Sequence, residues 1–361
     1  MEKKTKVLIS LLIIIILACA GVVAYKIYKD KIENKNFGQE NTEVINNTVD
    51  EPLEVEVKTV QTFKGDERPI AVMIDNHKAA LPQGGLNKAY MVYEIIVEGG
   101  ESRLMALFKG QNLEKIGPVR SSRHYFLDYA LENDAIYVHY GWSPQAQYDI
   151  SNLGVNNING ISESESSFWR VKDKRAPHNV ATSTAKILSI AERKGYKTTS
   201  TKKSVLNYVT DEVELTDGQN AEKITIPYSY SNDVEYTYDA TTKRYQRYSK
   251  GVKETDWSTG ENVTTKNIII TFAKNSVLND GENKDRQTLS NVGTLNGYYI
   301  TNGKAIKITC EKTSRSAQTV YKDLDGNEIK VNDGNTFVQI CPINAKVTIE
   351  GAEETVTEDI D

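Results

Sequence analysis

Apolar residues form one long run near the N-terminus and, further on, short runs separated by polar turns. The long run, residues 7–25, has 19 residues and no charge, which is close to the ~20 residues that a helix needs to cross the hydrocarbon core of a bilayer. It predicts a transmembrane segment. Residues 1–6 are basic and predict a short cytoplasmic N-terminus with the rest of the chain outside, because positive flanks stay inside.

A cysteine inside this run offers a second kind of anchor. Residues 16–19 (ILAC) are similar to a bacterial lipobox, in which the cysteine is lipidated and becomes the mature N-terminus. Leu17 is bulky for its place in that motif, and the chain stays apolar after Cys19 through Tyr25. The sequence favours an uncleaved anchor over lipidation at Cys19. Either anchor predicts folded domains that are tethered to the cell membrane on its outer side.

The pattern beyond the anchor predicts a linker and an α/β domain. Residues 26–64 are rich in Asn, Glu, Lys and Thr and predict a disordered linker, because such a segment has little apolar surface to bury. The α/β domain is expected over residues 65–205. The expected strands begin at residues 70, 89, 102 and 135. The expected helices are SRHYFLDYALEND, with a serine pair as N-cap, and TSTAKILSIAERKG.

The pattern of apolar and polar residues changes after about residue 205. Tyrosines alternate with polar residues in residues 224–251, and later strands follow with Asn-Gly and Asp-Gly turns. No helix is expected after about residue 215. The chain therefore predicts an all-β domain over residues 224–350 and an acidic tail over residues 351–361. The fold class is mixed, with an α/β layered domain followed by an all-β domain.

Composition limits the function classes. The 361 residues carry a net charge of -5, which argues against nucleic acid as a partner. Of three cysteines, Cys310 and Cys341 fall in expected strands. They either pair in an oxidising compartment or remain two buried thiols.

Two basic segments, residues 116–124 (IGPVRSSRH) and 168–179 (FWRVKDKRAPHN), point to an anionic ligand. Guanidinium groups bind phosphate and carboxylate with two hydrogen bonds, and a helix start supplies further donors. The expected ligand-binding residues are Arg103, Arg120, Ser121, Arg123, His139, Trp169 and Arg170. In the alternative, Arg120 and Arg123 form buried ion pairs with Glu94, Glu98 or Glu101.

Three residues are candidates for acid/base chemistry. His178 lies in a loop and titrates near neutral pH. Asp75 and Glu98 end their strands, where α/β sheets tend to hold ligands. His139 lies inside a strand, where a core histidine is the common explanation, and Trp169 either stacks on a ring or seals the domain. The sequence has no P-loop, dinucleotide fingerprint or zinc spacing, so no cofactor or metal is predicted.

Several of these segments together resemble one family. RPIAVMIDNH, VEGGESRLMALF, IGPVRSSRH, YVHYGWSPQA and RAPHNVATS occur in order and are similar to the YerB-like family of bacterial envelope lipoproteins. The likeness covers residues 66–200, with a weaker match over residues 230–345, where Cys310 and Phe337 stand at positions at which tryptophan is expected. The resemblance implies attachment outside the cytoplasm in a Gram-positive bacterium. It implies no reaction.

Three functions are compatible with these residues. The first is a tethered envelope protein that binds an anionic cell-wall ligand, such as a wall glycan, or a partner protein. The second is an enzyme, a hydrolase or transferase acting on an anionic wall glycan or its polyprenyl-phosphate carrier. The third is a structural spacer whose arginines form internal ion pairs. The sequence leaves catalysis and oligomeric state open.

Overall fold

The computed structural model describes residues 58–351. The expected transmembrane segment, Cys19, most of the linker and the acidic tail lie outside the described residues. The end of the linker, residues 58–64, lies against the fold, where the backbone N–H groups of Gln61 and Thr62 donate to Asp333. In residues 58–351, no helix has both the length and the apolar character to cross a membrane.

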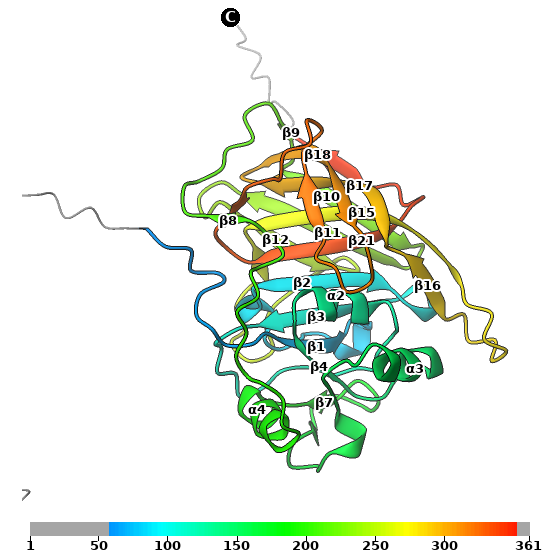
Figure 1. Ribbon diagram of the computed structural model, residues 1–361. Helices are drawn as coiled ribbons and strands as arrows, with labels where there is room; N and C mark the ends of the chain where they lie inside the picture. The colour runs from blue at the N-terminus through cyan, green and yellow to red at the C-terminus, as the bar shows by residue number, and fades with distance from the viewer. Residues whose placement is uncertain (1–57, 352–361) are drawn as a thin grey trace, which may run out of the picture. The chain divides into compact units, whose positions relative to one another are not determined.

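A mixed sheet of 12 strands forms the centre of the molecule (Figure 1). Its main path runs β19-β18-β17-β15-β21-β2-β3-β1-β4-β5, while β16 pairs with β15 and β9 with β18. The strands from the first half of the chain are β1 (Ile70–Asp75), β2 (Met91–Ile96), β3 (Ser102–Phe108), β4 (Ile136–His139) and β5 (Asn157–Asn159). Those from the second half are β9 (Gln219–Asn220), β15 (Asn267–Val277), β16 (Gln287–Ser290), β17 (Gly293–Thr301), β18 (Lys304–Lys312), β19 (Val320–Lys322) and β21 (Thr336–Pro342).

The two halves meet where β2 pairs in parallel with β21, from Met91 opposite Thr336 onward. The hydrophobic pattern predicts the strands on both sides of this seam, but it does not predict that they share a sheet. The coarse fold class is confirmed, since a mixed α/β part is joined to an antiparallel β sheet. The described residues cluster as one compact unit.

The second sheet has six strands and only antiparallel pairs. It consists of β10 (Lys223–Ser229), β11 (Asn232–Asp239), β12 (Arg244–Ser249), β13 (Val252–Lys253), β14 (Thr264–Thr265) and β22 (Thr348–Glu350). Burial alternates along β10 and β11 as the tyrosine pattern predicts. Short pairs complete the fold: β6 (Trp169–Arg170) with β7 (Val180–Ala181), and β8 (Tyr208–Val209) with β20 (Val331–Asn332).

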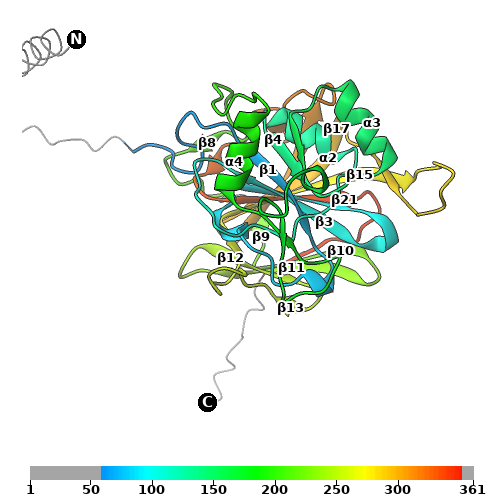
Figure 2. The same ribbon diagram turned by 90° about the horizontal axis from the view of Figure 1, so that it is seen from below.

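Each face of the large sheet has its own core. One core contains Val72, Ile74 and Val92 together with Ile224 and Tyr236 of the second sheet. The other core, on the opposite face, contains Met73, Tyr93 and Met105 together with residues of α2 (Phe126–Glu132) and α3 (Pro144–Asn152). Figure 2 shows the layers from below, with α4 (Thr184–Arg193) beside the strands.

The helices test the local predictions. α4 is confirmed, because the Ser183 side chain caps it and Gly195 follows it with φ +71°. α2 is also confirmed, but the serine pair does not cap it: the helix begins at Phe126 after Tyr125, which makes no capping hydrogen bond. α3 is not predicted, although its Ser143-Pro144 start is a known helix signal. No α- or 3-10 helix follows residue 193 in the described part of the chain.

The cysteines are free thiols on opposite faces of the large sheet. Cys310 belongs to the core below α2, and Cys341 belongs to the core shared with the second sheet. A sheet therefore separates the two sulfur atoms, and the described residues contain no Cys310–Cys341 disulfide.

Candidate functional site

The candidate site lies at the carboxyl end of β1, where residues 116–120 run between β1 and β7. Val119 N–H donates to the carbonyl of Val180 on β7, and Arg120 N–H donates to Met73 on β1. Gly117 makes this close passage possible, since a Cβ atom there would lie 2.7 Å from the carbonyl oxygen of Val180. The basic segment 116–124 is thereby fixed beside Asp75.

Asp75 is the centre of a group that we name the open cluster: Asp75, Arg120 and His178. Its carboxylate is 4% exposed, while the Arg120 and His178 side chains are 25% and 15% exposed. Oδ1 accepts the backbone N–H of His77 at 3.0 Å. Oδ2 lies 2.7 Å from His178 Nδ1 and 3.1 Å from Arg120 Nε. These contacts hold an ionised carboxylate between two cationic or donating groups.

The imidazole of His178 has one nitrogen engaged and one free. Nδ1 donates to Asp75, which leaves Nε2 as the acceptor in the neutral ring. The ring stacks on His77 with centroids 4.3 Å apart. His77 Nδ1 accepts the N–H of Ala79. A carboxylate that orients an imidazole in this way prepares Nε2 to take a proton.

Arg120 approaches Asp75 through Nε alone. The geometry is an ion pair rather than a hydrogen bond, because Nε is buried without a hydrogen-bond acceptor. Among residues 58–351, Asp75 is the only ion-pair partner of this guanidinium. The two Nη atoms are therefore available to an anion from solution.

A second ion-pair group stands beside the open cluster. Arg123 binds Glu98 with Nε at 2.5 Å and Nη2 at 2.9 Å, and Arg103 Nη2 is 3.8 Å from the same carboxylate. Burial raises the pKa of Glu98, but the hydrogen bond and charge of Arg123, with help from Arg103, hold it below its ordinary value. Arg103 Nη1 also donates to the carbonyl of Ser121 at 2.6 Å.

The positive charge in this region is concentrated. Burial lowers the pKa of Arg103 to about 10, and the charge of Arg123 and, to a smaller degree, that of Arg120 act in the same direction. Three arginines face two carboxylates, Asp75 and Glu98, so the group carries a formal charge of 3 − 2 = +1 with His178 neutral. An anion that enters would relieve this repulsion.

The remaining predicted side chains, those of His139, Arg170, Trp169 and Ser121, have partners other than the three side chains of the open cluster. His139 is fully buried, and its ring nitrogens contact Gly141 O at 2.8 Å and Asn157 Oδ1 at 3.2 Å. Burial lowers its pKa to about 4. It is a core histidine that supports the loop after β4.

Arg170 and Trp169 lie next to each other on β6. Arg170 binds Asn179 Oδ1 at 2.7 Å, with its guanidinium carbon 5.7 Å from the ring centroid of Tyr140. Trp169 lines a separate pocket. Ser121 Oγ donates to the carbonyl of Tyr140 and so stabilises the loop from within.

The ion-pair alternative holds for one arginine. Arg123 pairs with Glu98, one of the three predicted partners, whereas Arg120 pairs with Asp75. Glu94 binds Arg247 and Glu101 binds Lys250. Sequence reasoning missed the first of these pairs, because Glu94 and Arg247 are 153 positions apart and no local pattern links them.

Glu94, Arg247 and Glu254 make up what we name the closed cluster. All three side chains are at most 1% exposed. Arg247 Nη2 lies 2.7 Å from Glu94 Oε2, and Nη1 contacts Glu254. The closed cluster lies between the two sheets, where Glu94 also accepts from Asn76 and Ser102.

A metal ion finds no ready set of ligands here. Residues 58–351 contain no group of three or more His, Cys, Asp or Glu side chains placed to hold one.

Comparison with known proteins identifies the family. The model of the DUF3048 N-terminal domain, a protein domain of unknown function, matches residues 57–197, and that of the DUF3048 C-terminal domain matches residues 224–338. A Bacillus subtilis (strain 168) protein described as "Putative lipoprotein YerB" is 34% identical over 285 residues, which are 77% of this chain and 82% of that protein.

A solved structure agrees. The crystal structure of the YerB protein from Bacillus subtilis matches this fold with a TM-score of 0.70 at 32% identity, over 78% of this chain and 94% of that chain. The resemblance inferred from the sequence motifs is confirmed, and the chain belongs to the DUF3048 family, with both of its domains present and a YerB-like fold.

Proposed function

We propose that this protein is a membrane-tethered envelope protein that binds an anionic group of a cell-wall ligand at the open cluster. The tether is the apolar segment 7–25, either as a transmembrane anchor or through a lipid on Cys19. The description of the Bacillus subtilis relative as a lipoprotein supports attachment to the membrane.

The observation that carries the proposal is the state of Arg120. Its Nε lies against Asp75 while both Nη atoms have no carboxylate partner among the described residues. Its side chain is partly exposed, and Arg103 and Arg123 add positive charge nearby. A guanidinium with two parallel free donors in a positive field fits a phosphate or carboxylate.

The test is binding of inorganic pyrophosphate to the full chain, held in a polyoxyethylene detergent that carries neither sugar nor phosphate. Calorimetry of the wild type is expected to give saturable binding, and Arg120→Gln is expected to weaken it about tenfold, the equivalent of one charge-assisted contact. Arg193→Gln is the matched control, because Arg193 is an arginine with a 64% exposed side chain at the end of α4 and is likewise paired with one carboxylate, Glu163. Equal affinity in all three proteins would refute the proposal.

A second candidate is an enzyme, and the Asp75–His178 pair favours it. His178 Nε2 would take a proton from an attacking water or hydroxyl while Asp75 holds Nδ1–H at 2.7 Å. Arg120 would bind the phosphoryl oxygens of the substrate, and the leaving oxygen would recover the proton from His178. Release of nitrophenolate from bis(p-nitrophenyl) phosphate tests this, with His178→Gln expected to lose turnover. If the wild type binds pyrophosphate but does not turn over this substrate, the enzyme function is excluded and only the binding function remains.

A further inference from the structure

A pocket of about 530 Å³ lies at the seam between the two family domains, apart from the open cluster. Its wall combines the loop before β2, the loop after β3, β6 and a loop of the C-terminal domain. Its lining residues include Asn87, Lys88, Asn112, Glu114, Lys115, Trp169, Asp256 and Ser258. The volume is in the range typical of small-molecule sites.

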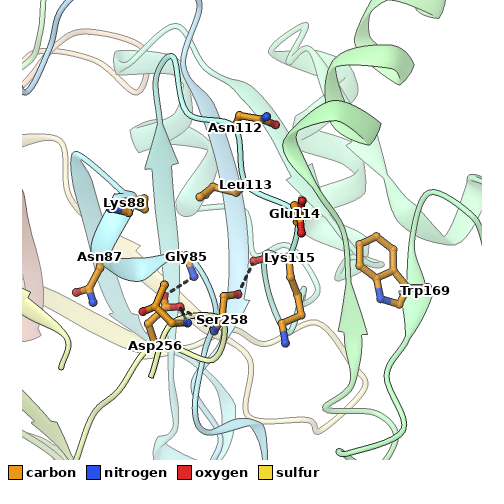
Figure 3. Close-up of a pocket in the computed structure, with 11 residues that line it drawn as sticks. Gly85, Asn87, Lys88, Asn112, Leu113, Glu114, Lys115, Trp169, Asp256 and Ser258 are labelled. Atoms are coloured by element: carbon orange, nitrogen blue, oxygen red, sulfur yellow. Dashed lines mark hydrogen bonds between the residues drawn. The ribbon is translucent and has the colours of Figure 1, made fainter. Parts of the chain in front are cut away.

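Hydrogen bonds between the two domains fix the floor of this pocket. Asp256 is 3% exposed and accepts the backbone N–H groups of Gly85 at 2.7 Å, Ser258 at 2.8 Å and Thr259 at 3.2 Å. Ser258 Oγ donates to the carbonyl of Lys115 at 3.4 Å. Figure 3 shows hydrogen bonds joining the loops that carry Gly85, Lys115 and Asp256. The shape of the pocket is therefore present before a ligand binds.

One wall is aromatic. Figure 3 shows Trp169 beside Glu114 and Lys115, with Asn87 and Lys88 on the opposite side of the pocket. Trp169 is only partly buried, although it lies on a two-stranded ribbon next to the core residue Phe168. An indole left partly open at the edge of a polar pocket offers an apolar plane with a polar tip.

A neighbouring tryptophan, Trp257, differs from Trp169 because its ring and its N–H group already have partners within the protein. Trp257 is covered by the ammonium groups of Lys115 and Lys174, at 4.1 and 4.6 Å from its ring centroid. Its indole N–H donates to Asp173 at 2.9 Å. Trp257 is thus occupied by the protein and clamps the seam, whereas Trp169 lines the pocket.

The charges that line the pocket cancel. Lys88 and Lys115 carry 2 positive charges, and Glu114 and Asp256 carry 2 negative charges, which gives 2 − 2 = 0. Exposed Lys88, Asn112 and Glu114 side chains provide donors and acceptors of both kinds. This balance differs from the open cluster, with its excess of positive charge, and it suits a ligand with many hydroxyl groups and no net charge.

We propose that this pocket binds an uncharged saccharide, with one pyranose ring stacked on Trp169 and its hydroxyl or acetamido groups hydrogen-bonded by Asn112, Glu114 and Lys88. The C–H face of a pyranose is apolar and its rim is polar, which matches one aromatic wall and a mixed polar rim. Ser258 and Thr259 of the C-terminal domain line the same pocket, so a ligand held by these side chains of the N-terminal domain lies at the seam. The proposal does not depend on the anion site.

The test uses the full chain in the same detergent, and chitotetraose, the β-1,4-linked tetramer of N-acetylglucosamine, as the uncharged probe. The chain has only three tryptophans, so indole fluorescence reports binding in the wild type, and calorimetry, which needs no indole, compares the affinities of the variants. A saturable change with a millimolar or tighter Kd is expected. Trp169→Ala is expected to weaken binding about tenfold or more, as for an aromatic anchor, and Asn112→Ala about threefold.

The controls separate this site from the other proposal. Trp142→Phe, whose indole lines a different pocket near α3, and Arg120→Gln are both expected to retain wild-type affinity for chitotetraose. Asn112 is exposed, so its variant folds even if Trp169→Ala does not. Absence of saturation by the wild type, or wild-type affinity in both Trp169→Ala and Asn112→Ala, overturns the saccharide site. Preference for tetragalacturonate, an anionic probe, over chitotetraose overturns the uncharged class.

Discussion

The open cluster lies at the end of β1 and the closed cluster lies between the two sheets, and the two differ in what surrounds them. Asp75 and Asn76 are adjacent in the chain, yet Asp75 belongs to the open cluster and Asn76 donates to Glu94 of the closed cluster. Arg120 keeps solvent access, whereas Arg247 is fully buried between two carboxylates. The same kind of ion pair therefore has two roles. Arg120 keeps guanidinium donors free for a ligand, whereas Arg247 is held by two buried carboxylates within the fold.

Replacement of Arg247 is expected to have the largest effect. Arg247→Met leaves Glu94 and Glu254 buried without a counter-charge, which costs about 3–5 kcal/mol of the free energy of unfolding. Urea unfolding at pH 7, followed by tryptophan fluorescence, measures this cost. Arg193→Met should change stability by less than about 0.5 kcal/mol, because the Arg193 side chain is 64% exposed and Glu163 keeps Lys194 as a second partner. If Arg247→Met unfolds with the same free energy as the wild type, the closed cluster does not stabilise the fold, and the contrast with the open cluster is wrong.

The pH dependence of stability is expected to come from a histidine in the core, His139. The pKa of His139 falls to about 4 on burial, below the ordinary value of about 6.5. The folded protein then binds fewer protons than the unfolded chain, so stability is complete above pH 6.5 and is lost as the pH falls toward 4.

The free energy of unfolding that His139 contributes above pH 6.5 and loses toward pH 4 is about 3 kcal/mol. His139→Gln should therefore flatten the plot of stability against pH in this range. His124 acts in the same direction, with a pKa lowered to about 4, while Asp128, with a pKa raised to about 6, acts in the opposite direction. The informative quantity is therefore the difference in slope between wild type and variant, measured by urea unfolding between pH 4 and 7. Parallel profiles would contradict the role of His139.

The loop that holds Arg120 is expected to show a smaller effect. Gly117→Ala brings a Cβ atom 2.7 Å from the carbonyl oxygen of Val180 at φ +142°, with an expected cost of about 2 kcal/mol. Gly154→Ala is the matched control, since Gly154 also has a positive φ but open space around it, and about 1 kcal/mol is expected there. Thermal unfolding of both variants distinguishes crowding from backbone strain, and equal costs would mean that close packing at Gly117 is unimportant.

The smallest loss of stability is expected where the ligand-binding effect is largest. Arg120→Gln should lower the free energy of unfolding by at most about 1 kcal/mol, because the guanidinium is partly solvated and His178 still binds Asp75. Urea unfolding of this variant beside Arg247→Met is the sharpest form of the comparison. A loss above about 3 kcal/mol would assign Arg120 a structural role and favour the spacer function.

Local patterns predicted the elements better than their partners. Apolar runs located β1 to β4, and capping residues located α4, since both depend on neighbours in sequence. The serine pair at 121–122 failed as a helix cap because each hydroxyl is engaged elsewhere: Ser121 donates to Tyr140 and Ser122 accepts from Tyr137. A hydroxyl that serves the tertiary structure is not available to a helix start.

The candidate site was predicted in composition but not in pairing. Asp75, Arg120 and His178 were all expected to act, and the structure brings them together around one carboxylate. The sequence could not assign Arg120 to Asp75 rather than to a glutamate, because that choice depends on how residues 116–120 cross β1. The sequence distinguishes His139, inside a strand, from His178, in a loop, and the structure buries His139 fully while the His178 side chain is 15% exposed.

The parallel pairing of β2 with β21 has a consequence for how the chain is made. Met91 meets Thr336, which is 336 − 91 = 245 positions later. The middle of the large sheet cannot close until nearly the whole polypeptide has emerged, and contacts of such sequence separation form slowly. A shortened chain that ends before β21 would leave β2 with an unpaired, apolar edge, which is a template for aggregation. The sheet is therefore completed only when residues 336–342 are available to pair with β2.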